Sequence, residues 1–251
     1  MKYFFFTRIA LEGNKIHPTY ATLPDDQIAR YIEFWLRYSR QFYEHQDGDF
    51  DFKVGLMYSR CYAHLLSDYT FPDYVDLTMD HPAHWIRNNS VGLGPVTVTR
   101  VDADDSYSND FMGFLGELGS MTQDALLLWK QIHQYDVASD TFYAPLTHGS
   151  PMFATIYRPN MAPFDPEDCI STDGTPLLGI VGNHGKYHLH DHVAPPTPYA
   201  LMRITGWNRQ NLLGLMGRQR LHPTPTSEGR SRFAGLAARN TGQDDTTSAG
   251  M

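Results

Sequence analysis

The residues most suited to chemistry are Asp102, Asp104 and Asp105, three aspartates within four positions directly after a β-branched stretch at 95–101. Carboxylates this close repel one another, so a positive group is expected to offset their charge. Hard divalent cations such as Mg²⁺ and Mn²⁺ prefer oxygen ligands of this kind. A metal held there could neutralise a diphosphate and help it to leave. The other interpretation is a solvated acidic turn that caps the next helix.

A second group of candidate ligands is the histidine cluster at 184–192, which contains His184, His188, His190 and His192. In an extended backbone the last three side chains point to one face, because strand side chains alternate. Imidazole nitrogens arranged in this way can bind a metal. The cluster makes a His-metal hydrolase or oxygenase the alternative function. Its residue order is one position short of the His-x-His-x-Asp-His signature of binuclear hydrolases, which places the aspartate and the last histidine on the wrong faces. A polar loop with incidental histidines is the remaining interpretation.

A strand must lead into the three aspartates, and the β-branched residues at 95–101 predict one. Further strands are predicted at 2–11, 50–59, 72–80, 151–158 and 176–184, and helices at 24–46, 60–70, 81–90, 110–135 and 198–217. A break of the 110–135 helix at Gly119-Ser120 is the alternative for that stretch. Alternation of this kind favours an α/β domain with a mostly parallel sheet. Ligands of such sheets bind at the carboxyl ends of the strands, which is where the aspartates should lie.

Composition limits the class of protein. Of the 251 residues, 41% are hydrophobic and 13% aromatic, which is enough to bury a core and excludes wholesale disorder. The formal charge of −8 argues against a global electrostatic grip on nucleic acid. Two cysteines, Cys61 and Cys169, exclude a disulfide framework and fit reduced, buried thiols in a cytoplasmic protein. No apolar run has the length of a membrane span, so no transmembrane segment is expected.

The chain is expected to divide near residue 218. Residues 1–218 carry the predicted strands and helices, whereas apolar residues become rare from 219 onwards and Thr, Ser, Gly and Arg become common. We therefore expect one domain at 1–218 and a flexible C-terminal tail at 219–251.

The run TRVDADDSYSNDFM at 99–112 resembles the Asp-x-Asp region of nucleotide-sugar glycosyltransferases with the GT-A fold. It is most similar to the group named for rhamnosyltransferases. Weaker matches are Thr7-Arg8 at the end of the first predicted strand, the stretch at 49–53 and the pair His184-Gly185. The resemblance implies a GT-A, Rossmann-like sheet flanked by helices. It also implies transfer of a sugar from a nucleotide-diphosphate sugar to a hydroxyl acceptor, with Mn²⁺ or Mg²⁺ as cofactor.

The same resemblance implies roles for individual residues. Asp102 would face the ribose and the water shell of the metal, Asp104 would ligate the metal, and Asp105 would orient the donor sugar. The remaining positions are the metal ligand His184 or His190, Lys186 on the diphosphate, and Thr7, Arg8 and Arg100 on the nucleotide side.

An inverting transferase also needs a general base for the acceptor hydroxyl. The acidic run at 165–168 offers Asp165, Glu167 and Asp168, and the Glu167-Asp168 pair resembles the Glu-Asp element of many inverting GT-A enzymes. Further candidates are Asp140 and Asp173 for the base, Tyr58 and Ser59 for the nucleobase pocket, and Arg87 for a phosphate. A retaining enzyme would need no such base, and a non-catalytic binding protein with the same fold is a third possibility.

Overall fold

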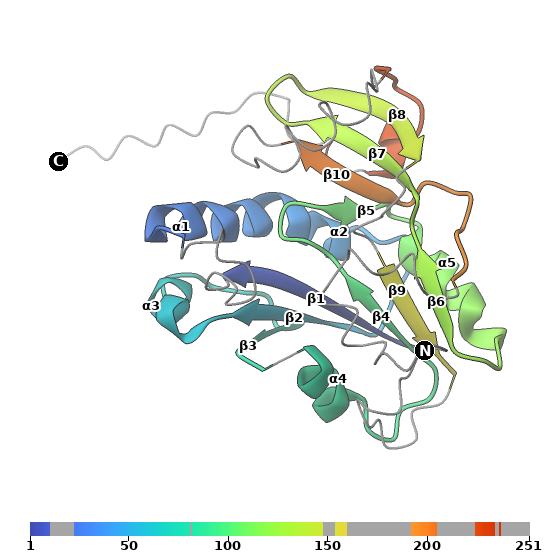
Figure 1. Ribbon diagram of the computed structural model, residues 1–251, viewed down its shortest axis with the longest axis horizontal. Helices are drawn as coiled ribbons and strands as arrows, with labels where there is room; N and C mark the ends of the chain where they lie inside the picture. Colours follow the sequence, from blue (N-terminus) through green and yellow to red (C-terminus); the bar gives the residue numbers. More distant parts are fainter. Residues whose placement is uncertain are drawn as a thin grey trace.

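The structure, a computed structural model, describes residues 1–10, 23–80, 82–147, 154–159, 192–204, 224–233 and 236. Figure 1 shows two β-sheets, with the helical segment of α1 and α2 between them and α4 beyond the larger sheet. No helix in these ranges is long and apolar enough to cross a membrane.

The larger sheet has six strands in the order β3-β2-β1-β4-β9-β6. The strands are β1 (Lys2–Ala10), β2 (Phe52–Tyr58), β3 (Val75–Thr78), β4 (Val96–Arg100), β6 (Ala125–Leu128) and β9 (Ala154–Arg158). The first four are mutually parallel, and β9 is antiparallel to both of its neighbours. The predicted α/β domain with a mostly parallel sheet is confirmed.

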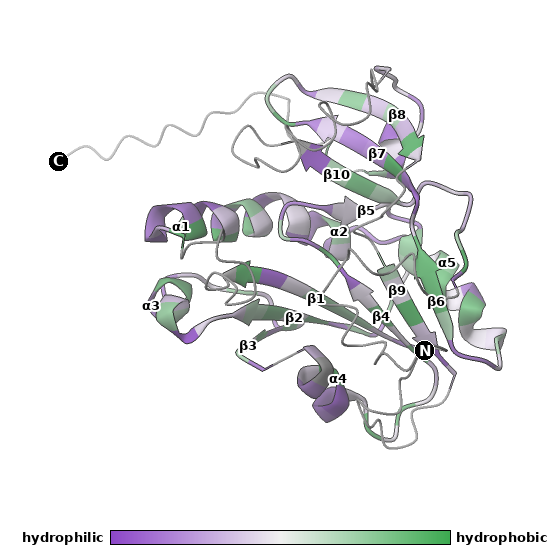
Figure 2. Ribbon diagram, viewed as in Figure 1, coloured by the Kyte–Doolittle hydropathy of each residue, from purple (hydrophilic) through white to green (hydrophobic). Residues whose placement is uncertain are grey.

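The middle of central strand β1, Tyr3–Phe6, is aromatic throughout, because both faces of the sheet are covered there. Phe5 points into the cluster that also receives Ile28 and Ile32 of α1. Its neighbours Phe4 and Phe6 point to the other face, where the cluster includes residues of α4. Figure 2 shows hydrophobic residues along the central strands and hydrophilic residues on the outer side of α4. This packing fixes the carboxyl ends of β1, β2 and β4 relative to one another.

One long helical segment crosses the larger sheet in three parts: α1 (Asp25–Phe34), the π-helical turn Trp35–Ser39 and α2 (Arg40–Glu44). It corresponds to the predicted helix at 24–46. The other helices are α3 (Ala63–Leu66), α4 (Pro82–Ser90) and α5 (Phe111–Glu117). The predicted helix at 81–90 is therefore confirmed, and the short helix predicted at 60–70 is present as a 3-10 turn at Arg60–Tyr62 and α3, which end at Leu66. Cys61 is exposed in that turn, so the expectation of a buried thiol is wrong there.

The smaller sheet has the order β5-β10-β7-β8. Its strands are β5 (Ser106–Tyr107), β7 (Gln131–Asp136), β8 (Thr141–Thr147) and β10 (Ala200–Ile204). The helix predicted from Asp110 is present as α5, followed by a 3-10 turn at Leu118–Ser120, where the alternative break was expected. Its continuation to residue 135 is wrong, because β6 and β7 follow. The helix predicted over 198–217 is wrong for residues 200–204, which form strand β10. Residues 205–217 and the strand predicted at 176–184 lie outside the described residues.

These errors have a common physical reason. Leu126 and Leu128 pack on one face of the larger sheet and Leu127 on the other, so β6 is buried on both sides. A strand of this kind reads as a continuous apolar run, which periodicity alone does not separate from a buried helix. In β10, Ala200 and Leu201 likewise enter different clusters.

Part of the expected flexible tail at 219–251 is packed onto the smaller sheet. Pro225 bridges to Tyr143 of β8, and the Phe233 and Leu236 side chains are buried. Arg232 pairs with Asp110 at 2.8 Å. The expectation of a flexible tail does not hold for residues 224–233 and 236, because two apolar side chains and two arginine ion pairs hold this polar stretch in place.

Candidate functional site

The three aspartates lie at the carboxyl edge of the larger sheet, as the sequence predicts. Phe6 of β1 is in register with Arg100 of β4, so the residues that follow on each strand reach the same edge. The Asp105 amide donates to the Asp102 carbonyl at 3.0 Å, which closes a turn. We call residues Asp102–Asp105 the acidic turn. Thr7 and Arg8 therefore lie at the same edge as the acidic turn.

Arg100 has a different position from the expected one in an open nucleotide pocket. It is 1% exposed, and its Nε and Nη2 atoms donate to Asp102 Oδ1 at 3.1 and 2.8 Å. The Asp102 side chain remains 25% exposed. A guanidinium fork in this geometry fixes the orientation of a carboxylate. Arg100 therefore positions Asp102 at the surface of the site.

The other two aspartates are more deeply buried than the resemblance implies. Asp104 and Asp105 are 6% and 2% exposed. The backbone amide of Arg203, on β10, donates to Asp105 Oδ1 at 3.3 Å, and Arg203 Nη1 donates to the Asp104 carbonyl at 3.1 Å. Asp105 is thus engaged with the smaller sheet.

The charge of the acidic turn extends to neighbouring groups. The pKa of Asp105 is raised well above its usual value by burial and by the charges of Asp104 and Asp102. Burial and the same two carboxylates raise the pKa of Tyr31, on α1, to about 12. Burial lowers the pKa of the Arg203 guanidinium to about 10, against the opposing effect of Asp105 and Asp104. The region between α1 and the acidic turn is therefore electrostatically negative.

Tyr31 is a candidate site residue that the sequence did not indicate. It precedes Ile32 at the edge of the buried stripe of α1 and is half-buried. The buried stripe of this helix can be predicted from the sequence. The proximity of Tyr31 to Asp102 and Asp104, by contrast, arises only from tertiary packing.

The π-helical turn Trp35–Ser39 holds the acidic turn from the helical side. Ser39 Oγ donates to the Ala103 carbonyl at 2.6 Å. Arg203 donates to Ser39 Oγ from Nη1 and to the Tyr38 carbonyl from Nη2, both at 3.4 Å. A π turn widens the hydrogen-bond ladder, and such turns are frequent at functional sites. Here it brings the helix, the acidic turn and β10 together.

The remaining predicted residues divide into three groups. Tyr58 is the last residue of β2 and Ser59 follows it, and both lie half-buried at the same edge, with Tyr58 in register with Ala10 of β1. Asp140 is engaged elsewhere, by Tyr135 and Arg230, and Arg87 is exposed in the last turn of α4 before β4 begins. The candidates that lie outside the described residues are Asp165, Glu167, Asp168, Asp173, His184, Lys186, His188 and His190.

The described part of the chain holds no complete set of metal ligands. No cluster of three His, Cys, Asp or Glu side chains suited to a metal is found among the described residues. The available donors are the Asp102 and Asp104 carboxylates, which are hard oxygen ligands in a negative region. Their chemistry fits Mg²⁺ or Mn²⁺, which bind through one or two carboxylates together with substrate phosphates.

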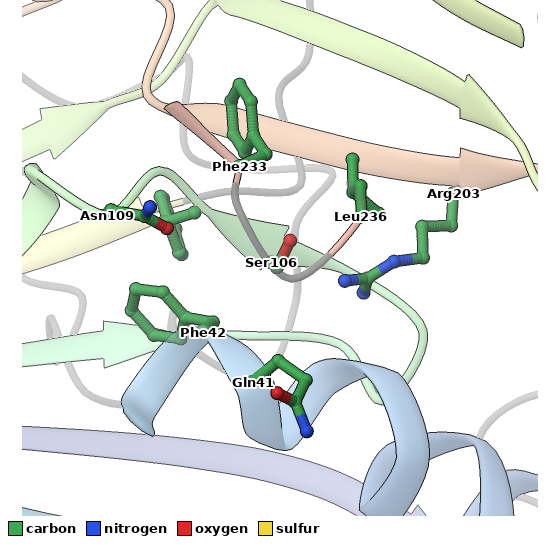
Figure 3. Close-up of a pocket in the computed structure, with 8 residues that line it drawn as sticks. Gln41, Phe42, Ser106, Asn109, Arg203, Phe233 and Leu236 are labelled. Carbon is green, nitrogen blue, oxygen red and sulfur yellow. The ribbon is translucent and has the colours of Figure 1, made fainter. Parts of the chain in front are cut away.

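Arg203 also lines a small cavity (Figure 3). Its volume is about 10 Å³, which is room for roughly one water. Its walls come from α2, β5 and the loop after it, β10, and residues 224–233 and 236, which we call the C-terminal segment. The lining residues are Gln41, Phe42, Ser106, Tyr107, Asn109, Arg203, Phe233 and Leu236. This cavity is too small for a nucleotide sugar, so it is not the proposed substrate site.

Comparison with known proteins gives little guidance. No protein-family model matches the chain, and no curated protein matches it. One solved structure that matches is HddC from Yersinia pseudotuberculosis in complex with GMP-PN, at 12% identity and a TM-score of 0.33, covering 81% of this chain and 90% of that chain. A likeness this weak supports no conclusion about function, which must be inferred from the site itself.

Proposed function

We propose that this chain is a metal-dependent glycosyltransferase of the GT-A type, which moves a sugar from a nucleotide-diphosphate sugar to a hydroxyl acceptor. One observation carries the proposal: an acidic turn at the carboxyl end of β4, beside the end of β1, with Asp102 held at the surface by a buried arginine. In open α/β sheets this edge is where ligands bind.

Asp102 and Asp104 would hold Mn²⁺ or Mg²⁺, which supplies neutralisation of the diphosphate as it leaves. The chain's own contribution is to hold these two carboxylates in fixed orientations before the metal binds. Arg100 fixes the Asp102 carboxylate, and the contacts of Arg203 and Ser39 fix the main chain at Ala103 and Asp104. Groups held by such a network need not reorganise when charge develops on the leaving diphosphate.

The neighbouring strand ends would bind the nucleoside. Arg8 of β1 and Tyr58 at the end of β2 are half-buried on strands that reach this edge, and they are the proposed contacts of the nucleoside. Thr7 is fully buried within β1 and would support this edge from below. Tyr31 adds an aromatic wall on the α1 side. Asp168 remains the proposed general base, and His184 or His190 the proposed additional metal ligand.

The first experiment is thermal unfolding across a panel of nucleotides and nucleotide sugars, with and without Mn²⁺. A ligand that binds only the folded state raises the midpoint, and a concentration of 100 times Kd adds about 2.7 kcal/mol. We expect an Mn²⁺-dependent rise with one nucleoside diphosphate. Asp104→Asn should abolish that rise, whereas Asp73→Asn, an exposed acidic residue in the loop before β3, should preserve it.

Two results would contradict the proposal. One is the absence of a shift with any nucleotide, together with a loss of stability when a chelator is added, which would favour the His-metal alternative at 184–192. The other is an Asp104→Asn variant that keeps the full Mn²⁺-dependent shift.

A further inference from the structure

We propose that Arg203 is a positioning residue for the acidic turn, so that metal and diphosphate bind there only when β10 is in place. This inference rests on the proposed glycosyltransferase function and assigns a role to a residue that lies about one hundred positions away from the aspartates in sequence.

The contacts of Arg203 are concentrated on the site. Its backbone amide donates to the Asp105 carboxylate, and its Nη1 atom donates to the Asp104 carbonyl. Its Nη2 atom donates to the Tyr38 carbonyl in the π-helical turn. In Figure 3 the Arg203 side chain extends from β10 towards the helical segment. A single buried side chain thus joins the smaller sheet, the helix and the acidic turn.

The second link is Ser39. Its hydroxyl accepts from Arg203 Nη1 at 3.4 Å and donates to the Ala103 carbonyl at 2.6 Å. Two successive carbonyls of the acidic turn, those of Ala103 and Asp104, are therefore held by one connected set of donors. Since the main chain at Asp104 is fixed on both sides, the direction in which its carboxylate leaves the turn is fixed as well.

Arginine is needed here for its shape as well as its charge. Its planar guanidinium donates in several fixed directions, whereas a lysine ammonium is a compact point charge on a flexible stem. Arg203 reaches Asp104, Ser39 and Tyr38 at the same time, which a lysine in this position does not reproduce. Charge alone would leave the turn attracted to β10 but not oriented.

Removal of the Arg203 charge alone would leave Asp105 buried without its counter-charge, and such a variant is at risk of not folding. Three other variants avoid this difficulty. Arg203→Lys keeps the charge, the double variant Asp105→Asn/Arg203→Met removes both charges, and Ser39→Ala removes only the linking hydroxyl. The matched control is Arg158→Met/Asp124→Asn, an arginine–aspartate pair at 3.1 Å beside the start of β4.

The readout is the dissociation constant of Mn²⁺, measured by electron paramagnetic resonance with the nucleoside diphosphate that stabilises the wild type. Urea unfolding of each variant verifies that it is folded. We expect the Lys variant and the double variant to bind Mn²⁺ at least tenfold more weakly, and Ser39→Ala about threefold or more. The control pair should stay within twofold of the wild type.

Wild-type Mn²⁺ affinity in any of the three folded variants would overturn the positioning role of Arg203 and its link through Ser39. A wild-type protein that binds no Mn²⁺ with any nucleotide would instead overturn the proposed function, and the inference with it. The two failures are distinguishable because the first appears only in the variants and the second in the unaltered chain.

Discussion

Phe233 offers a sharp test of whether the C-terminal segment belongs to the domain. The ring is 3% exposed and lies 5.7 Å from the Phe142 ring and 5.5 Å from the His133 ring, measured between centroids. It packs with Leu201 of β10 and with Leu236 in one cluster. Phe233→Ala would remove the largest apolar group that the segment contributes.

The expected magnitude follows from the surroundings of the ring. Truncation of a buried phenylalanine to alanine costs about 3–5 kcal/mol, depending on how far the site can relax. Phe233 lies in a short segment and borders the small cavity beside Arg203, so its surroundings can partly close around the gap. We therefore expect a loss near the lower end, about 3 kcal/mol. In a chain of this size that corresponds to a fall in Tm of roughly 6–12 °C.

Urea unfolding followed by tryptophan fluorescence measures the change in the free energy of unfolding. The matched control is Val91→Ala, an apolar truncation at a position that is 62% exposed after α4, for which a change within about 0.5 kcal/mol is expected. If Phe233→Ala and Val91→Ala gave the same free energy of unfolding within about 0.5 kcal/mol, the segment would not be part of the cooperative domain, and the argument from its burial would be refuted.

Two further perturbations test the packing. His133 donates from Nδ1 to the Tyr143 carbonyl, and burial lowers its pKa below the usual 6.5, with Arg232 acting in the same direction and Glu228 against it. The unfolded state therefore binds the proton more tightly, so this contribution to stability is present above pH 6.5 and is lost as the pH falls below it. His133→Gln should flatten that part of the curve of unfolding free energy against pH, measured by urea titration. An unchanged slope in the variant would contradict the assignment of this pH dependence to His133. Gly55→Ala places a Cβ 2.9 Å from the indole of Trp85 and should cost about 1–3 kcal/mol in the same assay. Gly113→Ala, on an open face of α5, should be neutral or stabilising by up to about 1 kcal/mol, and equal values for the two glycine variants would refute the close contact.

The sequence was sufficient for the central strands and for the place of the acidic turn. Strands β1, β2 and β4 are short runs of β-branched and aromatic residues bounded by turn residues, and these signals are local. The pairing of Arg100 with Asp102 is also local, since residues two apart on an extended chain share a face. It could have been read from the sequence, which would have placed Arg100 in a supporting role.

The sequence was insufficient wherever the outcome depended on distant partners. The burial of β6 on both faces is decided by β9 and the surrounding layers, and its leucines fit a helix equally well. The engagement of Asp105 by Arg203 joins positions that are 98 apart, and no spacing rule relates them. The packing of Phe233 is a similar case, because a single aromatic in a polar stretch gives no periodic signal.

The position of β10 has a consequence for how the protein is made. It is the last strand of the smaller sheet in sequence, yet it lies between β5 and β7. During synthesis from the amino terminus, β5 and β7 emerge well before β10, the strand that joins them. The hydrogen bonds between Arg203 and the acidic turn also form only after β10 has emerged. Contacts between such distant positions close slowly, because the entropy of a long loop must be overcome first. Unpaired strand edges are prone to aggregation, so the nascent chain is exposed to this risk between the emergence of residue 136 and that of residue 204.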